Sequence, residues 1–250
     1  MIGLLAQPVV TGLLVVVAAY GGLTMRRNLD WRDGLTLYRE TLRFTPRSVR
    51  AWVNLGHAHQ EAGDVTQARA AYERALQLSP GAADVVQNLG VIEAAEGHPE
   101  HALAAYERAL VLDSGFADPH NNLGNIYREQ GKYEDAEREF RAALQLDPSH
   151  VAARNNLGLT LQAMGRPQEA EQAFLEALRI DPDSASAHSN LGNIYFRRGA
   201  LEEARSEYLN AIRLDPDYAE AYNNLGSVHF RMGRPDLAEG AYRQALRINP

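Results

Sequence analysis

The hydrophobic positions of residues 117–150 predict two helices joined by a tight turn. Leu123 and Ile126 are spaced as on one face of a helix. Gly131 follows them, and glycine is favoured where a helix ends because it readily takes a positive φ. A second helix is predicted from the apolar residues Ala136, Phe140, Ala143, Leu144 and Leu146. That helix ends at Asp147, because the proline that follows disfavours helical geometry in the residue before it.

The same pattern recurs along the chain at a fixed step of 34 residues. Each copy contains Asn-Leu-Gly, and no residue is inserted or deleted between copies. The six units begin at Val49, Ala83, Ala117, Val151, Ala185 and Ala219. A single pair of amphipathic helices cannot bury its apolar face, so such pairs must stack on one another. The sequence therefore predicts an all-α solenoid over residues 49–250.

The repeated positions resemble a known helical repeat. In the first unit they are Trp52, Leu55, Gly56, Gly63, Ala68, Tyr72, Ala75 and Pro80. This pattern resembles the tetratricopeptide repeat (TPR), and all six units fit it. The resemblance implies a right-handed superhelix whose first helices line a concave groove that binds other proteins. The Asn-Leu-Gly form is most similar to the repeats of the intracellular O-linked N-acetylglucosamine transferase, although nothing here matches the catalytic half of that enzyme.

The N-terminal segment has a different character from the repeats. Residues 2–25 contain no charged side chain. As a helix they would be about 36 Å long at about 1.5 Å per residue, enough to cross a hydrocarbon core of about 30 Å. We therefore predict a transmembrane helix over residues 1–25. A cleaved signal peptide is the alternative, but such a peptide typically has basic residues at its N-terminus and a shorter apolar core.

Residues 26–48 join this segment to the first full unit. Tyr38 and Pro46 stand one period before Tyr72 and Pro80, so residues 26–48 are predicted to be a half-repeat that caps the solenoid next to the membrane. The junction also resembles that of multi-pass membrane O-mannosyltransferases, glycosyltransferases whose TPR tails lie on the extracytoplasmic side. The positive-inside rule points the other way, because arginines follow the apolar segment and no basic residue precedes it. The side of the membrane stays open.

The first helices carry the residues with functional content. An Asn precedes every Leu-Gly, at Asn54, Asn88, Asn122, Asn156, Asn190 and Asn224. Each costs about 0.7 kcal/mol relative to Ala in a helix interior, so six cost about 4 kcal/mol, and some interaction should offset this. Further Asn side chains lie beside them, at Asn121, Asn155, Asn223, Asn125 and Asn193.

A carboxamide can pair with both the N–H and the C=O of a peptide backbone. Helices pack about 8–10 Å apart, and an extended chain advances about 3.3 Å per residue, so one Asn would meet every third ligand residue or so. We therefore predict that the Asn side chains line a groove that binds extended polypeptide with little regard for its sequence. The alternative is that they only tie adjacent units together.

Charge and motifs exclude other classes of function. The chain carries −7 overall and residues 1–48 carry +3, so residues 49–250 carry −10, a poor balance for binding nucleic acid. No phosphate loop, nucleophile elbow or metalloprotease motif occurs, so no catalytic residue and no cofactor are predicted. Arg50 is isolated, so a basic clamp for a C-terminal carboxylate is not expected. No metal site is predicted, because neither His57 with His59 nor His98 with His101 has a carboxylate or cysteine set at zinc spacing.

These observations predict a membrane-tethered TPR scaffold that binds extended polypeptide, and not an enzyme in itself. The alternative is the C-terminal, substrate-recognising part of a multi-pass membrane glycosyltransferase of the O-mannosyltransferase kind. No polar capping helix covers the last unit before Pro250, so end-to-end self-association is a further possible partner interaction.

Overall fold

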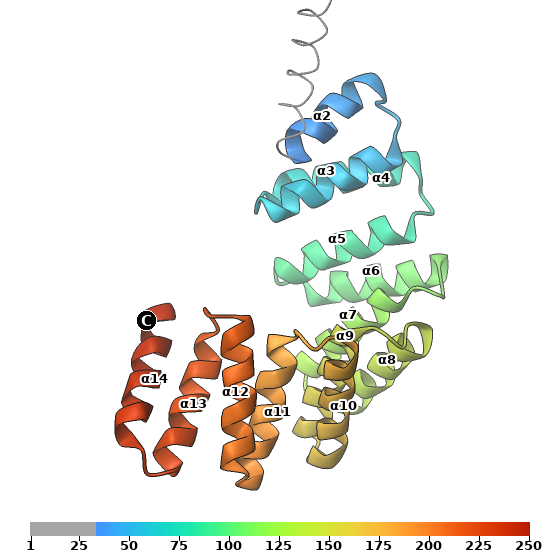
Figure 1. Cartoon of the computed structure of the whole chain (residues 1–250). Helices are drawn as coiled ribbons and strands as arrows, with labels where there is room; N and C mark the ends of the chain where they lie inside the picture. The colour runs from blue at the N-terminus through green and yellow to red at the C-terminus, as the bar shows by residue number, and fades with distance from the viewer. Residues whose placement is uncertain (1–33) are drawn as a thin grey trace, which may run out of the picture. The chain divides into compact units, whose positions relative to one another are not determined.

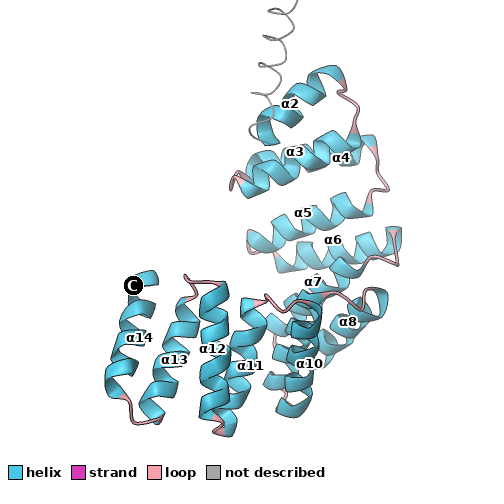
Figure 2. Ribbon diagram, viewed as in Figure 1, coloured by secondary structure: helices cyan, strands magenta, loops and turns pink. Residues whose placement is uncertain are grey.

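The computed structural model describes residues 34–250, which form thirteen α-helices and no strand (Figures 1 and 2). The helices are α2 (Gly34–Phe44), α3 (Val49–Glu61), α4 (Val65–Leu78), α5 (Ala83–Ala95), α6 (Pro99–Leu112), α7 (Ala117–Glu129), α8 (Tyr133–Leu146), α9 (Val151–Ala163), α10 (Pro167–Ile180), α11 (Ala185–Arg198), α12 (Leu201–Leu214), α13 (Ala219–Arg231) and α14 (Pro235–Ile248). The prediction of an all-α solenoid is confirmed over this part of the chain. These residues divide into two compact units, 34–108 and 109–250.

In the second unit the helices pack as antiparallel pairs, α7 with α8, α9 with α10, α11 with α12 and α13 with α14. The second helix of each pair also packs on the first helix of the next pair. The first helices α7, α9, α11 and α13 contact one another in turn, so they form a layer of their own. This layer presents the Asn-Leu-Gly positions.

One large aromatic residue fills the space between the two helices of a pair. Phe140 is fully buried and contacts the backbone of Gly124 on the facing helix. A Cβ atom built on Gly124 would lie 2.6 Å from Cε1 of Phe140, which is closer than non-bonded atoms approach. Glycine is therefore required at this crossing. At the turn that follows, Gly131 has a φ of 73°, as the sequence predicts for the end of the first helix.

Four of the second helices, α6, α8, α10 and α12, end at an aspartate that accepts a hydrogen bond from the turn that follows. Asp147 Oδ1 accepts hydrogen bonds from the backbone N–H of Ser149 at 2.9 Å and from its hydroxyl at 2.6 Å. These bonds stabilise the charged carboxylate and lower the pKa of Asp147. The same backbone bond is made by Asp113, Asp181 and Asp215 in the second, fourth and fifth repeats. The helix therefore stops where the sequence places Asp-Pro or Asp-Ser.

The first unit has the same local construction. Tyr72 is fully buried among Ala68, Val85 and Ile92. Before the first full repeat, α2 packs on α3, and its Leu42 is buried in one cluster with residues of α3 and α4. The α2 helix thus lies in the stretch 26–48 that the sequence assigns to a half-repeat.

No helix between residues 34 and 250 combines the length and hydropathy needed to cross a membrane. The transmembrane helix predicted over residues 1–25 lies outside the described residues, as does the first part of the half-repeat, residues 26–33.

Candidate functional site

The six Asn residues of the Asn-Leu-Gly motifs lie on the first helices, one each on α3, α5, α7, α9, α11 and α13. Asn190 is buried, with 9% of its surface exposed, and the other five are partly exposed. Of the neighbouring Asn residues, Asn121 is buried and Asn223 is exposed, and Asn125, Asn155 and Asn193 are partly exposed. The predicted residues therefore share one helix layer but differ in how much of each side chain reaches solvent.

Side-chain hydrogen bonds join the Asn residues of neighbouring first helices. Asn156 Nδ2 donates to Asn121 Oδ1 at 3.1 Å, which ties α9 to α7. Asn190 Nδ2 donates to Asn155 Oδ1 at 2.9 Å, which ties α11 to α9. In both ties the donor belongs to an Asn-Leu-Gly motif, and the acceptor is the residue just before the previous motif.

A substitution in the fifth repeat changes the hydrogen-bond partner, but the two neighbouring first helices are still joined. Ser189 stands where the two earlier units of this series have the accepting Asn. Asn224 on α13 donates instead to Asn193 Oδ1 on α11, at 3.0 Å. The same oxygen accepts a hydrogen bond from the hydroxyl of Tyr208, at 2.7 Å.

In the first compact unit, residues 34–108, no such tie joins α3 and α5 among the described residues. The residue 35 positions before Asn88 is Val53, whose side chain offers no acceptor. The Asn ties are thus a feature of the second unit, where they hold the first-helix layer together.

These bonds match the alternative interpretation, in which the Asn residues connect adjacent units. These bonds leave hydrogen-bonding capacity on the Asn side chains, because each donating carboxamide keeps a second N–H and its own oxygen. Contact between these residues and a peptide stays a prediction.

A second polar pairing, which the sequence reasoning missed, joins the two helices within a unit. The hydroxyl of Tyr72 lies 3.0 Å from His57 Nδ1, and that of Tyr242 lies 3.2 Å from Ser227 Oγ. Tyr208 pairs with Asn193 in the same way. Burial raises the pKa of Tyr72 to about 12, so this hydroxyl stays protonated at neutral pH. The signal in the sequence was a Tyr placed 15 residues after a polar residue.

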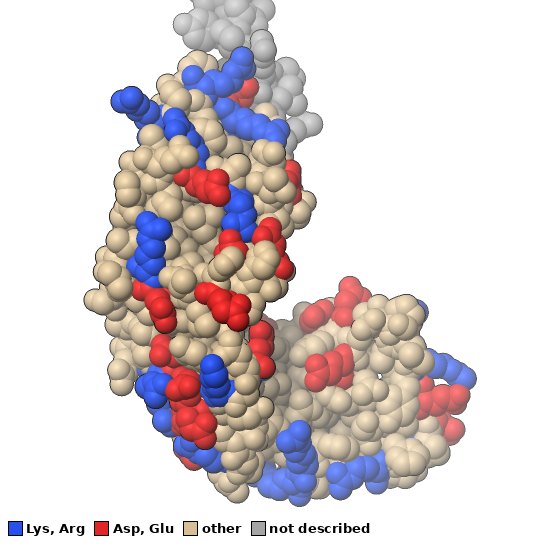
Figure 3. All heavy atoms as spheres, turned by 180° about the vertical axis from the view of Figure 1, so that it is seen from behind, with Lys and Arg blue, Asp and Glu red and all other residues tan. Residues whose placement is uncertain are grey.

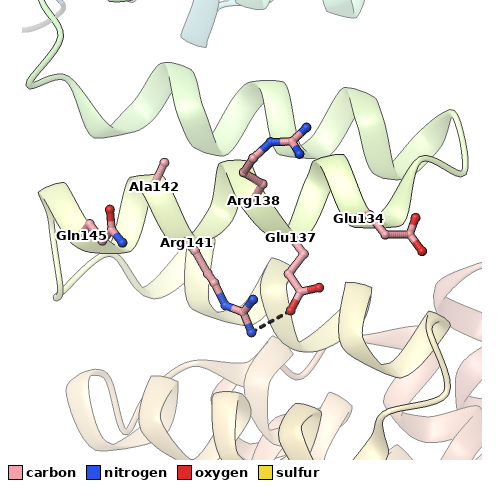
Figure 4. A pocket seen from close by; sticks show the side chains of 6 residues that line it. All are labelled: Glu134, Glu137, Arg138, Arg141, Ala142 and Gln145. Carbon is pink, nitrogen blue, oxygen red and sulfur yellow. Dashed lines mark ion pairs between the residues drawn. The ribbon is translucent and has the colours of Figure 1, made fainter.

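The charged side chains of the described residues do not form a continuous basic band on the face drawn in Figure 3, where acidic and basic groups are interspersed among uncharged ones. On α8 they surround a shallow pocket of about 350 Å³ (Figure 4). Glu137 is paired there with Arg141 at 2.6 Å, and Arg166 at the start of α10 bonds both carboxylate oxygens of Glu137, at 2.9 and 2.8 Å. Glu137 thus pairs with Arg141 within this pocket, and its bond to Arg166 joins two repeats.

A larger pocket, of about 520 Å³, lies on the last pair of helices. It is lined by Glu220, Asn223, Tyr242, Leu246 and other residues of α13 and α14. Leu246 is 64% exposed. Tyr242 is partly exposed, whereas the aromatic residues at the equivalent position of the earlier repeats are buried. This is the surface on which the sequence predicts end-to-end self-association.

Comparisons with solved structures find several repeat proteins of the same architecture. The structure of Pseudomonas aeruginosa pilF matches with a TM-score of 0.72 and 26% identity over 81% of this chain and 92% of its own. The structure of YrrB, described as a TPR protein with an unusual peptide-binding site, matches with a TM-score of 0.54 and 25% identity over 72% of this chain and 92% of its own. The Cut9–Hcn1 hetero-tetramer of the APC/C has a TM-score of 0.79 at 20% identity, over 86% of this chain and 43% of that chain, and shows the fold alone.

Comparison with curated protein sequences finds no match. Family models described as tetratricopeptide repeat match residues 22–83, 53–120 and 121–185, and further models of the same repeat match 161–210, 192–233 and 219–250. These matches extend over more than half of the chain, and they agree with the paired helices, the glycine crossings and the period of 34 residues. The chain therefore belongs to the tetratricopeptide repeat family.

Proposed function

We propose that this protein is a scaffold that binds extended polypeptide along the first-helix layer of its second unit. Membership of the tetratricopeptide repeat family supports a role in protein interaction. The likeness to YrrB, which is described as having a peptide-binding site, supports a peptide as the ligand. The Asn residues of α7, α9, α11 and α13 would contact the peptide backbone.

The Asn ties carry this proposal. Asn156 and Asn190 are each held by a hydrogen bond to the neighbouring repeat, so their carboxamides are already ordered before a ligand arrives. Ordering a side chain on binding costs about 0.5–1.5 kcal/mol, and a pre-ordered group avoids part of that cost. The ties therefore prepare a row of donors and acceptors as well as joining the repeats.

The accessible members of the row are those most suited to direct contact. Asn122, Asn156 and Asn224 are partly exposed and Asn223 is exposed. Asn121 and Asn190 are mostly covered, so we assign them the role of holding their neighbours in place.

Fluorescence anisotropy with a labelled peptide tests the proposal. The probe is a 12-residue unstructured peptide of mixed sequence, and its partner is the same peptide with alternate backbone nitrogens methylated. The change is Asn122→Ala combined with Asn156→Ala and Asn224→Ala. We expect the triple variant to bind the unmodified peptide at least about tenfold more weakly, because about 1 kcal/mol is expected for each lost hydrogen bond. Methylation should weaken binding to the unchanged protein as well, because it removes backbone donors.

Asn210→Ala is the matched control, because Asn210 is also a partly exposed helical Asn but lies on α12, in the second-helix layer. It should leave affinity unchanged. Circular dichroism and thermal melting report any loss of the Asn ties separately. Equal affinity of the triple variant and Asn210→Ala would contradict the proposed contact, as would full binding of the methylated peptide.

We also infer that residues 1–25 anchor the scaffold in a membrane, from the 24 uncharged residues of positions 2–25. The narrower alternative is that the repeats recognise substrate for a membrane glycosyltransferase whose catalytic part is not in this chain. It rests on the sequence of the junction and on the Asn-Leu-Gly form of the repeats. The side of the membrane on which the repeats lie separates the two.

A further inference from the structure

Two histidines and a glutamate converge at the turn between α5 and α6, in the first unit. His98 immediately precedes α6 and His101 lies in its first turn, on the same side of the helix. Glu93 is near the end of α5, and Gly97, with a φ of 80°, reverses the chain between them. The turn thereby supplies the carboxylate that the spacing of the two histidines lacks in the sequence.

The distances fit a divalent transition metal. Glu93 Oε2 lies 3.2 Å from His98 Nδ1 and 3.4 Å from His101 Nδ1. Two ligands of a tetrahedral Zn²⁺ with bonds of about 2.0–2.1 Å lie about 3.3–3.4 Å apart. All three ligand atoms lie within 4.8 Å of one another. Two of the three edges of a ligand triangle therefore have the length that a tetrahedral site requires, and the third is at most 4.8 Å.

The surroundings hold the carboxylate in place. Arg69 on α4 donates to the other oxygen of Glu93, Oε1, at 2.5 Å, and to Glu96 at 2.6 Å. Ligating carboxylates in metal sites are commonly oriented by such a second hydrogen bond.

The local charge favours a cation. Glu93 and Glu96 face a single guanidinium, and the Nδ1 of His98 lies 3.8 Å from Glu96. With neutral imidazoles the cluster has a net charge of −1, which offsets the unfavourable effect of the helix N-terminus on a cation.

We propose that Glu93, His98 and His101 form a binding site for a divalent transition metal, with Zn²⁺ as the ion that fits their chemistry best. Imidazole and carboxylate are ordinary ligands of Zn²⁺, and three protein ligands leave a coordination position for water. The ion links the end of α5 to the start of α6. The site lies on the turn edge of the first unit and is independent of the peptide-binding proposal.

Isothermal titration of the full chain with ZnCl₂ tests this site. The protein carries no histidine tag and is first stripped of metal with a chelator. We expect one ion to bind per chain. His101→Ala should weaken this binding at least about tenfold, because even the loss of a group that only orients a ligand typically weakens metal binding about 10–100-fold. His101 is exposed, with 74% of its side chain accessible, so its replacement leaves the core intact. His98→Ala should weaken binding to the same degree, and thermal melting checks that each variant is folded.

His120→Ala is the matched control. His120 also pairs with a carboxylate, Glu139, at 2.7 Å, but it belongs to no cluster of three ligands in the described residues. Its replacement should leave the affinity and the stoichiometry unchanged. Titration with Co²⁺ gives a second measurement, because a four-coordinate ion produces intense visible absorption that His101→Ala should abolish. Absence of Zn²⁺ binding to the unchanged protein, or unchanged binding to both His98→Ala and His101→Ala, would overturn the proposal.

Discussion

At the scale of single residues, Asn125 presents an acceptor without a partner. Its Oδ1 is buried and makes no hydrogen bond. In the equivalent place of the fifth unit, Asn193 accepts a hydrogen bond from the hydroxyl of Tyr208. The third unit has Phe140 in place of that tyrosine. Both rings sit against the glycine of the facing helix in the same way, so a hydroxyl on Phe140 would point at Asn125.

We therefore expect Phe140→Tyr to stabilise the protein by about 1 kcal/mol, the net value of a hydrogen bond that satisfies a buried group. For a domain of this size that corresponds to a rise of about 2–4 °C in Tm, measurable by calorimetry.

Phe140→Tyr combined with Asn125→Leu is the control for this change. Leucine is close in size to asparagine but offers no hydrogen-bond acceptor, so the new hydroxyl loses its intended partner. The rise in Tm should then be lost. An equal rise with and without the Asn125 carboxamide would mean that the paired polar residue does not matter.

At the scale of helices, Arg166 connects neighbouring repeats through two carboxylates. It bonds Glu137 on α8 and, through Nε and Nη2, Glu169 on α10. The bond from Arg166 lowers the pKa of Glu169 below its ordinary value of 4.5. Below about pH 4.5 the unfolded chain therefore binds more protons than the folded chain, and the stabilisation that is present above that pH is lost as the pH falls through the lowered pKa of Glu169.

Arg166→Ala should consequently lower Tm at pH 7, and its effect should shrink as the pH falls through the lowered pKa of Glu169 and this carboxylate becomes protonated. Thermal melts of both proteins across this range measure the difference. Arg243→Ala is the control, because Arg243 pairs with Glu239 at 2.6 Å but within one exposed helix face. Such exposed pairs contribute at most about 1 kcal/mol, so Arg243→Ala should change Tm little at any pH. A loss of Tm for Arg166→Ala that did not depend on pH would contradict the assigned ion pairs.

The helices themselves were predictable because each depends on residues close in sequence. Apolar spacing and Gly131 define α7, and the Asp147-Pro148 stop defines the end of α8 at Leu146. The partners in the Asn ties were not predictable, because two ties join residues 35 positions apart, one more than the repeat period, and the third joins residues 31 apart. These offsets depend on how one helix pair is displaced against the next, which the spacing within a repeat does not contain. The approach of Glu93 to His98 and His101 likewise depends on the reversal of the chain at Gly97.

At the scale of the whole molecule, the uncharged segment 2–25 favours a membrane, whereas the acidic repeats favour water. Deleting residues 1–25 should move the protein from the membrane pellet to the soluble fraction, because α2–α14 all lie beyond the deletion and keep their contacts. Immunoblotting of the two fractions measures this.

Two arginines placed in the apolar run, Val15→Arg with Val16→Arg, should have the same effect without shortening the chain, since each charge opposes insertion by about 2.5–3.5 kcal/mol. A shortened protein that still sediments would contradict the anchor.

The side on which the repeats lie can be read by protease protection of a tag placed after Pro250 in intact cells or spheroplasts. The arginines that follow the apolar segment, at 26, 27 and 32, favour a cytoplasmic location under the positive-inside rule, so we expect the tag to be protected. Lysed cells, in which the tag must be digested, provide the control. A protected tag supports an anchored scaffold that binds cytoplasmic polypeptide. A digested tag contradicts the charge rule for this chain, and it favours the alternative in which the repeats serve an extracytoplasmic glycosyltransferase.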